Sequence, residues 1–136
     1  MKTTCTYASK KHLEWLLKND RYMKKATLKK KISDKQIIII QSDKETLGWL
    51  RFGLIWDDTP FMHMLFIIEK KRQQGIGKKL VKFWENEMKK LKHDYVITST
   101  QSNEDAQHFY RKLGYKDSGS MELPDEPLEL FLIKKI

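Results

Sequence analysis

Cysteine is almost absent from this sequence. Cys5 is the single cysteine among 136 residues, so no intramolecular disulfide can form. No group of Cys and His has the spacing of a zinc site, and we expect no metal. Long apolar runs are also missing, because none approaches the roughly 18 residues needed to cross a bilayer and the N-terminus has no apolar stretch of the signal-peptide type. These absences predict a cytoplasmic protein with no membrane partner.

The composition is typical of one folded domain. Hydrophobic residues make up 40% of the chain and charged residues 33%, a mixture that suits a soluble globular protein. No repeat, low-complexity segment or linker divides the chain, so we expect a single domain over residues 1–136. The formal charge of +9 favours an anionic partner. The lysines are spread along the chain instead of forming one stripe, which makes nucleic acid the less favoured partner.

Helices and strands are expected in a mixed order. A helix capped by Ser9 is followed by a basic helix from about Arg21 to Lys31. The longest helix, from Gly75 to Leu91, carries Leu80, Val81, Trp84, Met88 and Leu91 at the helical period. A further helix begins after a cap at Ser102 or Asn103 and ends at Gly114. The expected strands are Thr3 to Tyr7, Ile37 to Ile40, Leu47 to Trp56, Phe61 to Ile68, Tyr95 to Thr100, Tyr115 to Met121 and Leu128 to Ile133.

One segment has the form of an anion-binding site. The apolar strand Phe61 to Ile68 leads through a short basic turn into the long helix, whose first backbone N–H groups lack partners within the helix. A Walker loop would need glycine at Arg72, and a dinucleotide-binding fingerprint would need glycine at Leu80, so neither pattern fits. The alternative is a helix that simply starts after a flexible turn.

The turn resembles the signature of the GNAT superfamily of N-acetyltransferases. That signature is Arg or Gln, two residues, Gly, one residue, and Gly or Ala, and it is met by Arg72, Gly75 and Gly77. A second match is Asn103 followed by the run Ala106 to Tyr115, which looks like the family's next helix and its Phe-Tyr-x-x-x-Gly-aromatic ending. The chain departs from the pattern at two positions, because Glu69 stands where many members have proline and Gln73 where many have glycine.

The resemblance implies a fold and a reaction. The fold class would be α/β (α+β), with a mixed central sheet of about six to seven strands flanked by about four helices. The cofactor would be acetyl-CoA, used as a co-substrate without a metal, and the acceptor would be a primary amine of a small molecule or peptide that attacks directly in a ternary complex.

The resemblance also assigns residues to acetyl-CoA. Backbone amides would bind the pyrophosphate, and the end of the preceding strand would pair with the pantetheine arm, which Asn103 would contact from its other side. A backbone N–H at Ile67 or Ile68 would stabilise the oxyanion, and Tyr110 would give a proton to the thiolate. The cofactor-binding residues are thus Ile67, Ile68, Glu69, Arg72, Gln73, Gln74, Gly75, Ile76, Gly77, Lys78, Asn103 and Tyr110.

Each catalytic assignment has a structural alternative. Tyr110 lies on the same stripe as Phe109 and Leu113 and could serve only the core, and Asn103 could serve only as a helix cap. His63 interrupts an apolar strand and is the candidate general base, since an imidazole with an ordinary pKa of about 6.5 suits proton transfer near neutrality. A histidine that only makes a hydrogen bond in the strand explains the same pattern.

Two other functions stay open at this stage. A basic RNA-binding module would use exposed aromatics such as Trp15 and Tyr22, and an acyl-CoA-binding regulator would keep the cofactor site without turnover. The acceptor pocket would come from the N-terminal helices and from the loops around Asp57 and Pro124. Exposed edge strands near the C-terminus are compatible with a homodimer.

Overall fold

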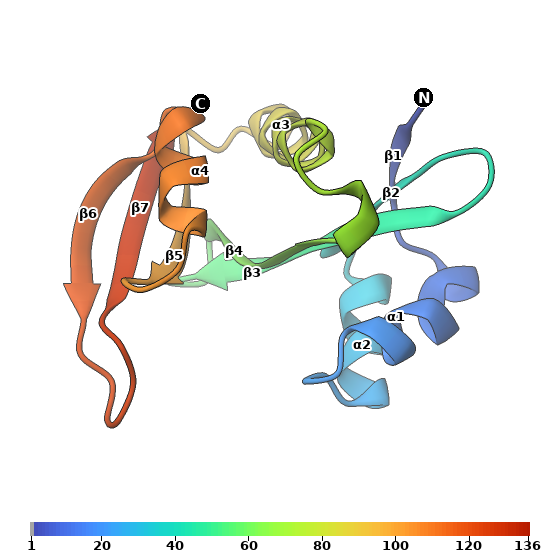
Figure 1. Ribbon diagram of the computed structural model, residues 1–136, viewed down its shortest axis with the longest axis horizontal. Helices are drawn as coiled ribbons and strands as arrows, with labels where there is room; N and C mark the ends of the chain where they lie inside the picture. Colours follow the sequence, from blue (N-terminus) through green and yellow to red (C-terminus); the bar gives the residue numbers. More distant parts are fainter. Residues whose placement is uncertain (1) are drawn as a thin grey trace. The chain divides into compact units, whose positions relative to one another are not determined.

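The computed structural model describes residues 2–136 and shows a mixed seven-stranded sheet with four α-helices (Figure 1). The strands are hydrogen-bonded in the order β1-β2-β3-β4-β5-β7-β6. The pair β4–β5 is parallel, whereas β1–β2, β2–β3, β5–β7 and β6–β7 are antiparallel. The predicted fold class is confirmed. The elements are β1 (Thr4–Tyr7), η1 (Lys10–His12), α1 (Leu13–Asn19), α2 (Lys25–Ser33), β2 (Ile37–Gln41), β3 (Thr46–Ile55), β4 (Thr59–Ile67), η2 (Glu69–Lys71), α3 (Ile76–Lys90), β5 (Tyr95–Gln101), α4 (Ala106–Lys112), β6 (Lys116–Met121) and β7 (Glu129–Lys135).

The chain forms two compact units. The first comprises residues 2–52 together with Met64–Trp84, and the second comprises Gly53–His63 together with Glu85–Ile136. Each unit is described on its own below. None of the helices in the described residues is long and apolar enough to cross a membrane.

The first unit buries both faces of its sheet. Ile39 of β2 lies opposite Trp49 of β3, and both point to the face that packs on Leu16 of α1 and Leu28 of α2. The neighbouring residues of each strand point to the opposite face, where Phe52 of β3 lies 5.8 Å from Trp84 of α3 between ring centroids. Successive side chains of β3 therefore point to two faces that are both buried, so neither face of this strand is exposed to solvent in the first unit.

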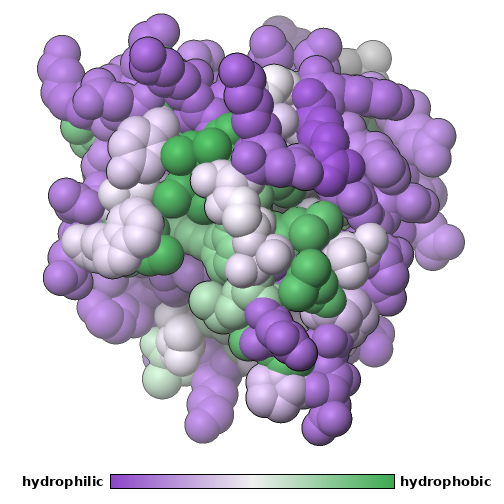
Figure 2. All heavy atoms as spheres, turned by 90° about the vertical axis from the view of Figure 1, so that its left-hand side faces the viewer, coloured by the Kyte–Doolittle hydropathy of each residue, from purple (hydrophilic) through white to green (hydrophobic). Residues whose placement is uncertain are grey.

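The second unit is built on β5, β7 and β6, with α4 against β5. Thr98 of β5 lies opposite Leu132 of β7, and both are buried. The strand β6 is exposed along its whole length and stands at one end of the strand order. Figure 2 views the molecule from the side that shows β6 in Figure 1, and apolar side chains are open to solvent there among polar ones. The edge strand that the homodimer prediction requires is present, and the homodimer itself stays a prediction.

Several element ends differ from those expected. The helix α2 begins at Lys25, four residues after the expected start, because residues 20–24 form a turn in which the Met23 N–H donates to the Asp20 carbonyl. The helix α3 ends at Lys90, so Leu91 is 63% exposed and does not continue the buried stripe. Gly114 has a φ of +97° directly after α4, as expected for a glycine that ends a helix.

Candidate active site

The loop between β4 and α3 lies in the first unit and is held by its own arginine. The Arg72 side chain turns back along the chain, and its Nε donates to the Ile67 carbonyl over 2.8 Å. The guanidinium carbon also lies 5.3 Å above the ring of Phe66, a cation–π distance. Arg72 therefore connects the end of β4 to the loop in addition to bringing positive charge.

Two loop residues adopt left-handed backbone conformations. Gln73 has a φ of 59° and Gly75 a φ of 78°. A Cβ added at Gly75 would meet no heavy atom within 4 Å, so the glycine is required by the backbone conformation and not by crowding. Gln73 occupies the position where many GNAT members have glycine, and its left-handed φ explains that preference.

The helix α3 begins directly after this turn. The Lys79 N–H donates to the Gly75 carbonyl over 3.1 Å, which is the first bond of the helix ladder. The amides of the first helical residues before it have no partner within the helix and lie at the positive end of the helix dipole. Arg72, Lys78 and Lys79 are exposed around them. Such an arrangement can accommodate a diphosphate.

The hydrogen bonds at the end of β4 distinguish the two amides that were expected to stabilise the oxyanion, those of Ile67 and Ile68. The Ile68 N–H donates to the Leu47 carbonyl of β3 over 2.9 Å, so this amide already has a partner. Of the two amides considered for the oxyanion, that of Ile67 stays the candidate. The side chain of Ile67 is buried, and Glu69 begins the short helix η2.

Tyr110 lies in the second unit, on α4, and is 6% exposed. Burial raises the pKa of its phenol to about 12, while a hydrogen bond with Thr98 acts in the opposite direction and the nearby Glu104 raises it further. The Thr98 hydroxyl donates to the Met62 carbonyl of β4 over 3.1 Å. The phenol is therefore protonated at neutral pH, which is the state that a proton donor needs.

His63 lies on the other face of the sheet in this unit. Met62 pairs with Thr98, so Met62 and Thr98 share the face of Tyr110, whereas His63 is the next residue of β4 and points away from that face. Its ring is 5.4 Å from that of Phe61. Phe61 in turn lies 6.0 Å from Phe131 of β7. The structure thus places the candidate acid and the candidate base on opposite faces.

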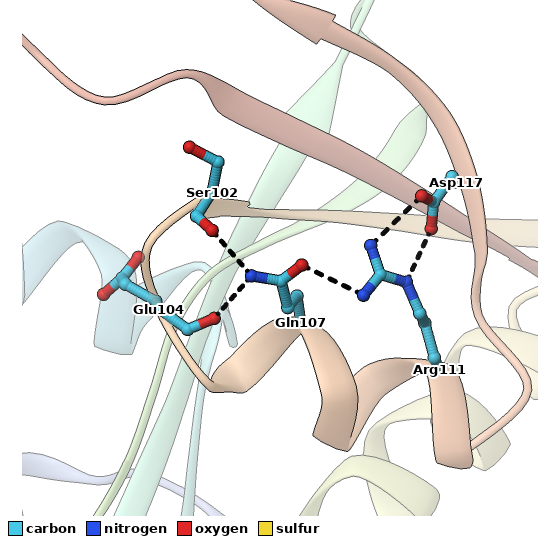
Figure 3. Close-up of polar contacts among 5 residues, drawn as sticks. All are labelled: Ser102, Glu104, Gln107, Arg111 and Asp117. Atoms are coloured by element: carbon cyan, nitrogen blue, oxygen red, sulfur yellow. Dashed lines mark hydrogen bonds and ion pairs between the residues drawn. The ribbon is translucent and has the colours of Figure 1, made fainter.

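Asn103 does not cap α4, which corrects the expected helix start. The residue before the helix is Asp105, and it makes no side-chain cap bond. Figure 3 shows what organises this turn: the Gln107 amide donates to the carbonyls of Ser102 and Glu104 over 2.8 and 2.9 Å. Asn103 itself is exposed. No structural role competes with its assignment to the cofactor within the described residues.

The chain of contacts continues along α4. Arg111 donates one hydrogen bond to the Gln107 side chain over 3.0 Å and one to each carboxylate oxygen of Asp117, over 2.9 and 3.1 Å (Figure 3). This contact with Asp117 depresses the pKa of the carboxyl group. The pair joins the helix to the first residues of β6.

Sequence reasoning missed a buried polar network in the second unit. Tyr115 donates to a Glu85 oxygen over 2.7 Å, and Lys134 donates to the other oxygen over 2.9 Å. Burial raises the pKa of the Tyr115 phenol, as does the adjacent Glu85. The Tyr115 ring packs 5.6 Å from that of Tyr110. No local pattern signals this network, because its members are 19 to 49 residues apart in the chain.

Solved structures share the fold over nearly the whole chain. An acetyltransferase of the GNAT family from Bacillus cereus ATCC 10987 has a TM-score of 0.80 and 22% identity, covering 99% of this chain and 98% of its own. The PaiA N-acetyltransferase from Thermoplasma acidophilum in complex with coenzyme A has a TM-score of 0.79 and 17% identity, with complete coverage of both chains. The ribosomal-protein-S18-alanine N-acetyltransferase from Escherichia coli has a TM-score of 0.81 and 12% identity, covering 99% and 94%.

Family membership is shown by the sequence itself. Among curated proteins no sequence matches this chain. The model of the acetyltransferase (GNAT) family matches residues 5–115, a range that contains the β4–α3 loop, Asn103 and Tyr110. This chain therefore belongs to the acetyltransferase (GNAT) family.

Proposed function

We propose that residues 1–136 form one acetyl-CoA-dependent N-acetyltransferase domain that transfers the acetyl group to a primary amine by direct attack in a ternary complex. The observation that carries the proposal is the β4–α3 loop, in which left-handed Gln73 and Gly75 directly precede α3, whose first amides have no partner within the helix. The coenzyme A complex of the similar Thermoplasma acidophilum protein supports this choice of cofactor.

The proposed cofactor contacts follow from the chemistry of each residue. The amides of Gln73 to Lys78 would bind the two phosphates at the positive end of α3. The Arg72 N–H already donates to the Glu69 carbonyl over 3.2 Å, so Arg72 would contribute its side-chain charge instead. The carbonyl of Ile67 is held by Arg72, so the strand end is fixed in an extended form to which the amide-bearing pantetheine arm can pair as a strand does. Asn103 would contact the same arm with its exposed side-chain amide.

The chemistry needs a proton acceptor for the amine and a proton donor for the sulfur. The neutral amine nitrogen forms a bond with the thioester carbon, and the carbonyl oxygen carries the negative charge until the carbon–sulfur bond breaks. Tyr110, whose phenol is neutral at pH 7 with a pKa that burial raises further above its ordinary value, would give its proton to the leaving thiolate, while His63 would take the proton that the attacking nitrogen loses.

Acetyl-CoA titration tests the proposal at the level of binding. A ligand at 100 times its Kd stabilises the folded state by about 2.7 kcal/mol, which we expect as a rise of the melting temperature by about 8 to 13 °C for a chain of this size. Unchanged melting at millimolar acetyl-CoA contradicts the proposal.

Turnover separates an enzyme from a silent acyl-CoA-binding regulator. We expect release of free thiol from acetyl-CoA when the protein is screened against small amines, polyamines and peptides with free N-termini. Tight binding of acetyl-CoA without thiol release for any acceptor class supports the regulator instead. For the RNA-binding alternative, Trp15 is half-buried and packs edge-on at 5.6 Å against Trp49, whereas Tyr22 is 89% exposed. Binding of an RNA oligonucleotide that falls steeply with salt would support this alternative.

A further inference from the structure

Thr98 of β5 is the polar residue that contacts the candidate acid. It is 1% exposed and therefore shielded from solvent. The Tyr110 side chain has one hydrogen-bond partner within residues 2–136, the Thr98 hydroxyl. Thr98, Tyr110 and Met62, to which Thr98 also bonds, all belong to the second unit. The geometry of this group of residues is therefore set within a single unit.

The direction of these hydrogen bonds follows from the protons that are present. A threonine hydroxyl has one proton to donate and two lone pairs that can accept. The Thr98 hydroxyl donates its proton to the Met62 carbonyl over 3.1 Å, so towards Tyr110 it acts as the acceptor. The phenol proton, which is the one proposed to reach the sulfur, is thus directed at Thr98.

A neighbouring tyrosine holds the Tyr110 ring but offers it no second donor. The Tyr115 ring meets that of Tyr110 edge-on, with 5.6 Å between the ring centroids. The Tyr115 hydroxyl donates to Glu85 over 2.7 Å, and Lys134 donates to the other oxygen of Glu85 over 2.9 Å. Both polar groups are therefore engaged at Glu85, and stabilisation of the Tyr110 oxygen depends on Thr98.

A negative charge on Tyr110 is costly at this site. Tyr110 is 6% exposed, and a buried charge without a partner is strongly unfavourable. The charge of Glu104 opposes ionisation of the phenol as well. Glu104 is fixed in its position, because it accepts from the Gln101 N–H over 2.7 Å and from the Thr100 hydroxyl over 3.1 Å. The hydrogen bond with Thr98 acts in the opposite direction and lowers the pKa of Tyr110.

We propose that Thr98 stabilises the deprotonated Tyr110 during acetyl transfer, by turning its hydroxyl proton from the Met62 carbonyl to the phenolate oxygen. The inference rests on the proposed function, in which Tyr110 is the acid. Thr98 keeps its own proton throughout and changes only the acceptor of its hydrogen bond. The change is favourable, because a hydrogen bond to a charged oxygen is roughly twice as strong as one between neutral groups.

The protons balance over the whole reaction. The phenol O–H bond breaks, and its proton forms the S–H bond of the leaving thiol. The proton that the attacking amine loses passes through the base to solvent, and the phenolate takes one proton back from solvent after the thiol has left. Thr98 therefore acts only while Tyr110 is charged.

Two substitutions isolate the hydroxyl of Thr98. Thr98→Val removes the hydroxyl and nearly keeps the shape of the side chain. Thr98→Ser keeps the hydroxyl and loses the methyl group. The serine variant is the matched control, because both changes alter a buried position but only valine removes the hydrogen-bond donor.

Titration of Tyr110 tests the pair without any reaction. Replacing the tyrosines by difluorotyrosine lowers the pKa of every phenol into a range in which the protein stays folded, and fluorine NMR follows each ring. The Tyr110 signal is the one that is missing from Tyr110→Phe. We expect Thr98→Val to decrease its acid dissociation constant by about tenfold or more, as for the loss of a hydrogen bond to a charged group. Thr98→Ser should leave the constant within about threefold.

A double-mutant cycle assigns the kinetic effect to the phenol. Thiol release is measured at saturating acetyl-CoA with the best acceptor of the amine and peptide screen. Thr98→Val should slow it by about threefold to tenfold in the wild-type protein, and by less than about twofold in Tyr110→Phe, because the hydroxyl acts only through the phenol. Thr98→Ser should stay within about twofold of the wild-type protein. A merely structural role of Thr98 predicts equal slowing in both backgrounds.

The outcomes separate the inference from the proposed function. An unchanged dissociation constant in Thr98→Val, the same decrease in Thr98→Ser, less than twofold slowing of the wild-type protein, or equal slowing in Tyr110→Phe overturns the inference. The expected dissociation constants without thiol release from any acceptor refute the enzyme and keep the Thr98–Tyr110 pair. Thiol release with an unchanged dissociation constant does the reverse.

Discussion

Replacing Gly75 by alanine tests the loop conformation on which the proposed cofactor binding depends. The φ of +78° costs an alanine about 1–2 kcal/mol, and about 0.4–1 kcal/mol returns because alanine has less freedom in the unfolded chain. No atom within 4 Å opposes the added methyl group, so the net loss is about 1 kcal/mol. We expect the melting temperature of Gly75→Ala to fall by about 3 to 5 °C.

The same change should weaken acetyl-CoA binding. An amide that no longer points at the diphosphate loses a hydrogen bond to a charged group, worth about 1.5–3 kcal/mol, so the Kd measured by calorimetry should rise at least about tenfold. Gly77→Ala is the matched control, because Gly77 lies inside α3 and the family signature accepts alanine there. That change should raise stability by up to about 1 kcal/mol and leave the Kd within about threefold. Wild-type binding by Gly75→Ala refutes the proposed loop.

Further changes test the acid, the base and the ion pair. Tyr110→Phe should lower thiol release at saturating acetyl-CoA by about 100-fold; a loss below fivefold removes Tyr110 from catalysis. The pKa of Tyr110 is raised to about 12 in the folded protein. Its contribution to the free energy of unfolding is therefore fully present below pH 10 and decreases by about 2.7 kcal/mol as the pH rises through 12. Alkaline unfolding should therefore be less steep in the phenylalanine variant, and an identical profile contradicts this. His63→Gln should slow transfer at neutral pH without changing acetyl-CoA binding, and an unchanged rate excludes His63 as the base. Arg51→Met leaves the Asp20 carboxylate buried and unpaired, so we expect the free energy of unfolding, measured by urea denaturation, to fall by about 3–5 kcal/mol. The double variant Arg51→Met/Asp20→Leu should largely restore it. A decrease below about 1 kcal/mol in the single variant contradicts the burial of the pair.

The sequence predicted the elements that depend on local patterns. The β-branched run at Ile37 to Ile40 gave a strand because such side chains suit a pleated, buried surface, and the stripe on α3 gave the longest helix within one residue at each end. Gly114 ended α4 for the reason expected, a left-handed φ. The β4–α3 turn was also predictable, because glycine requirements are local.

Features that depend on tertiary partners could not be predicted. The Arg51–Asp20 pair joins residues 31 positions apart, and no local pattern shows that Arg51 would be buried. The turn before α4 was misread because Asn103 looks like a cap, whereas Gln107 reaches back to that turn. The opposite faces of Tyr110 and His63 needed the register of β4 against β5, and strand register across a parallel pair is not encoded in either strand alone.

A crystal structure of this protein with acetyl-CoA tests the central claim most directly. The account predicts both phosphates within about 3.2 Å of main-chain nitrogens between Arg72 and Lys78, with Gln73 and Gly75 still left-handed. Acetyl-CoA bound with its diphosphate elsewhere, or an empty loop at saturating acetyl-CoA, contradicts it.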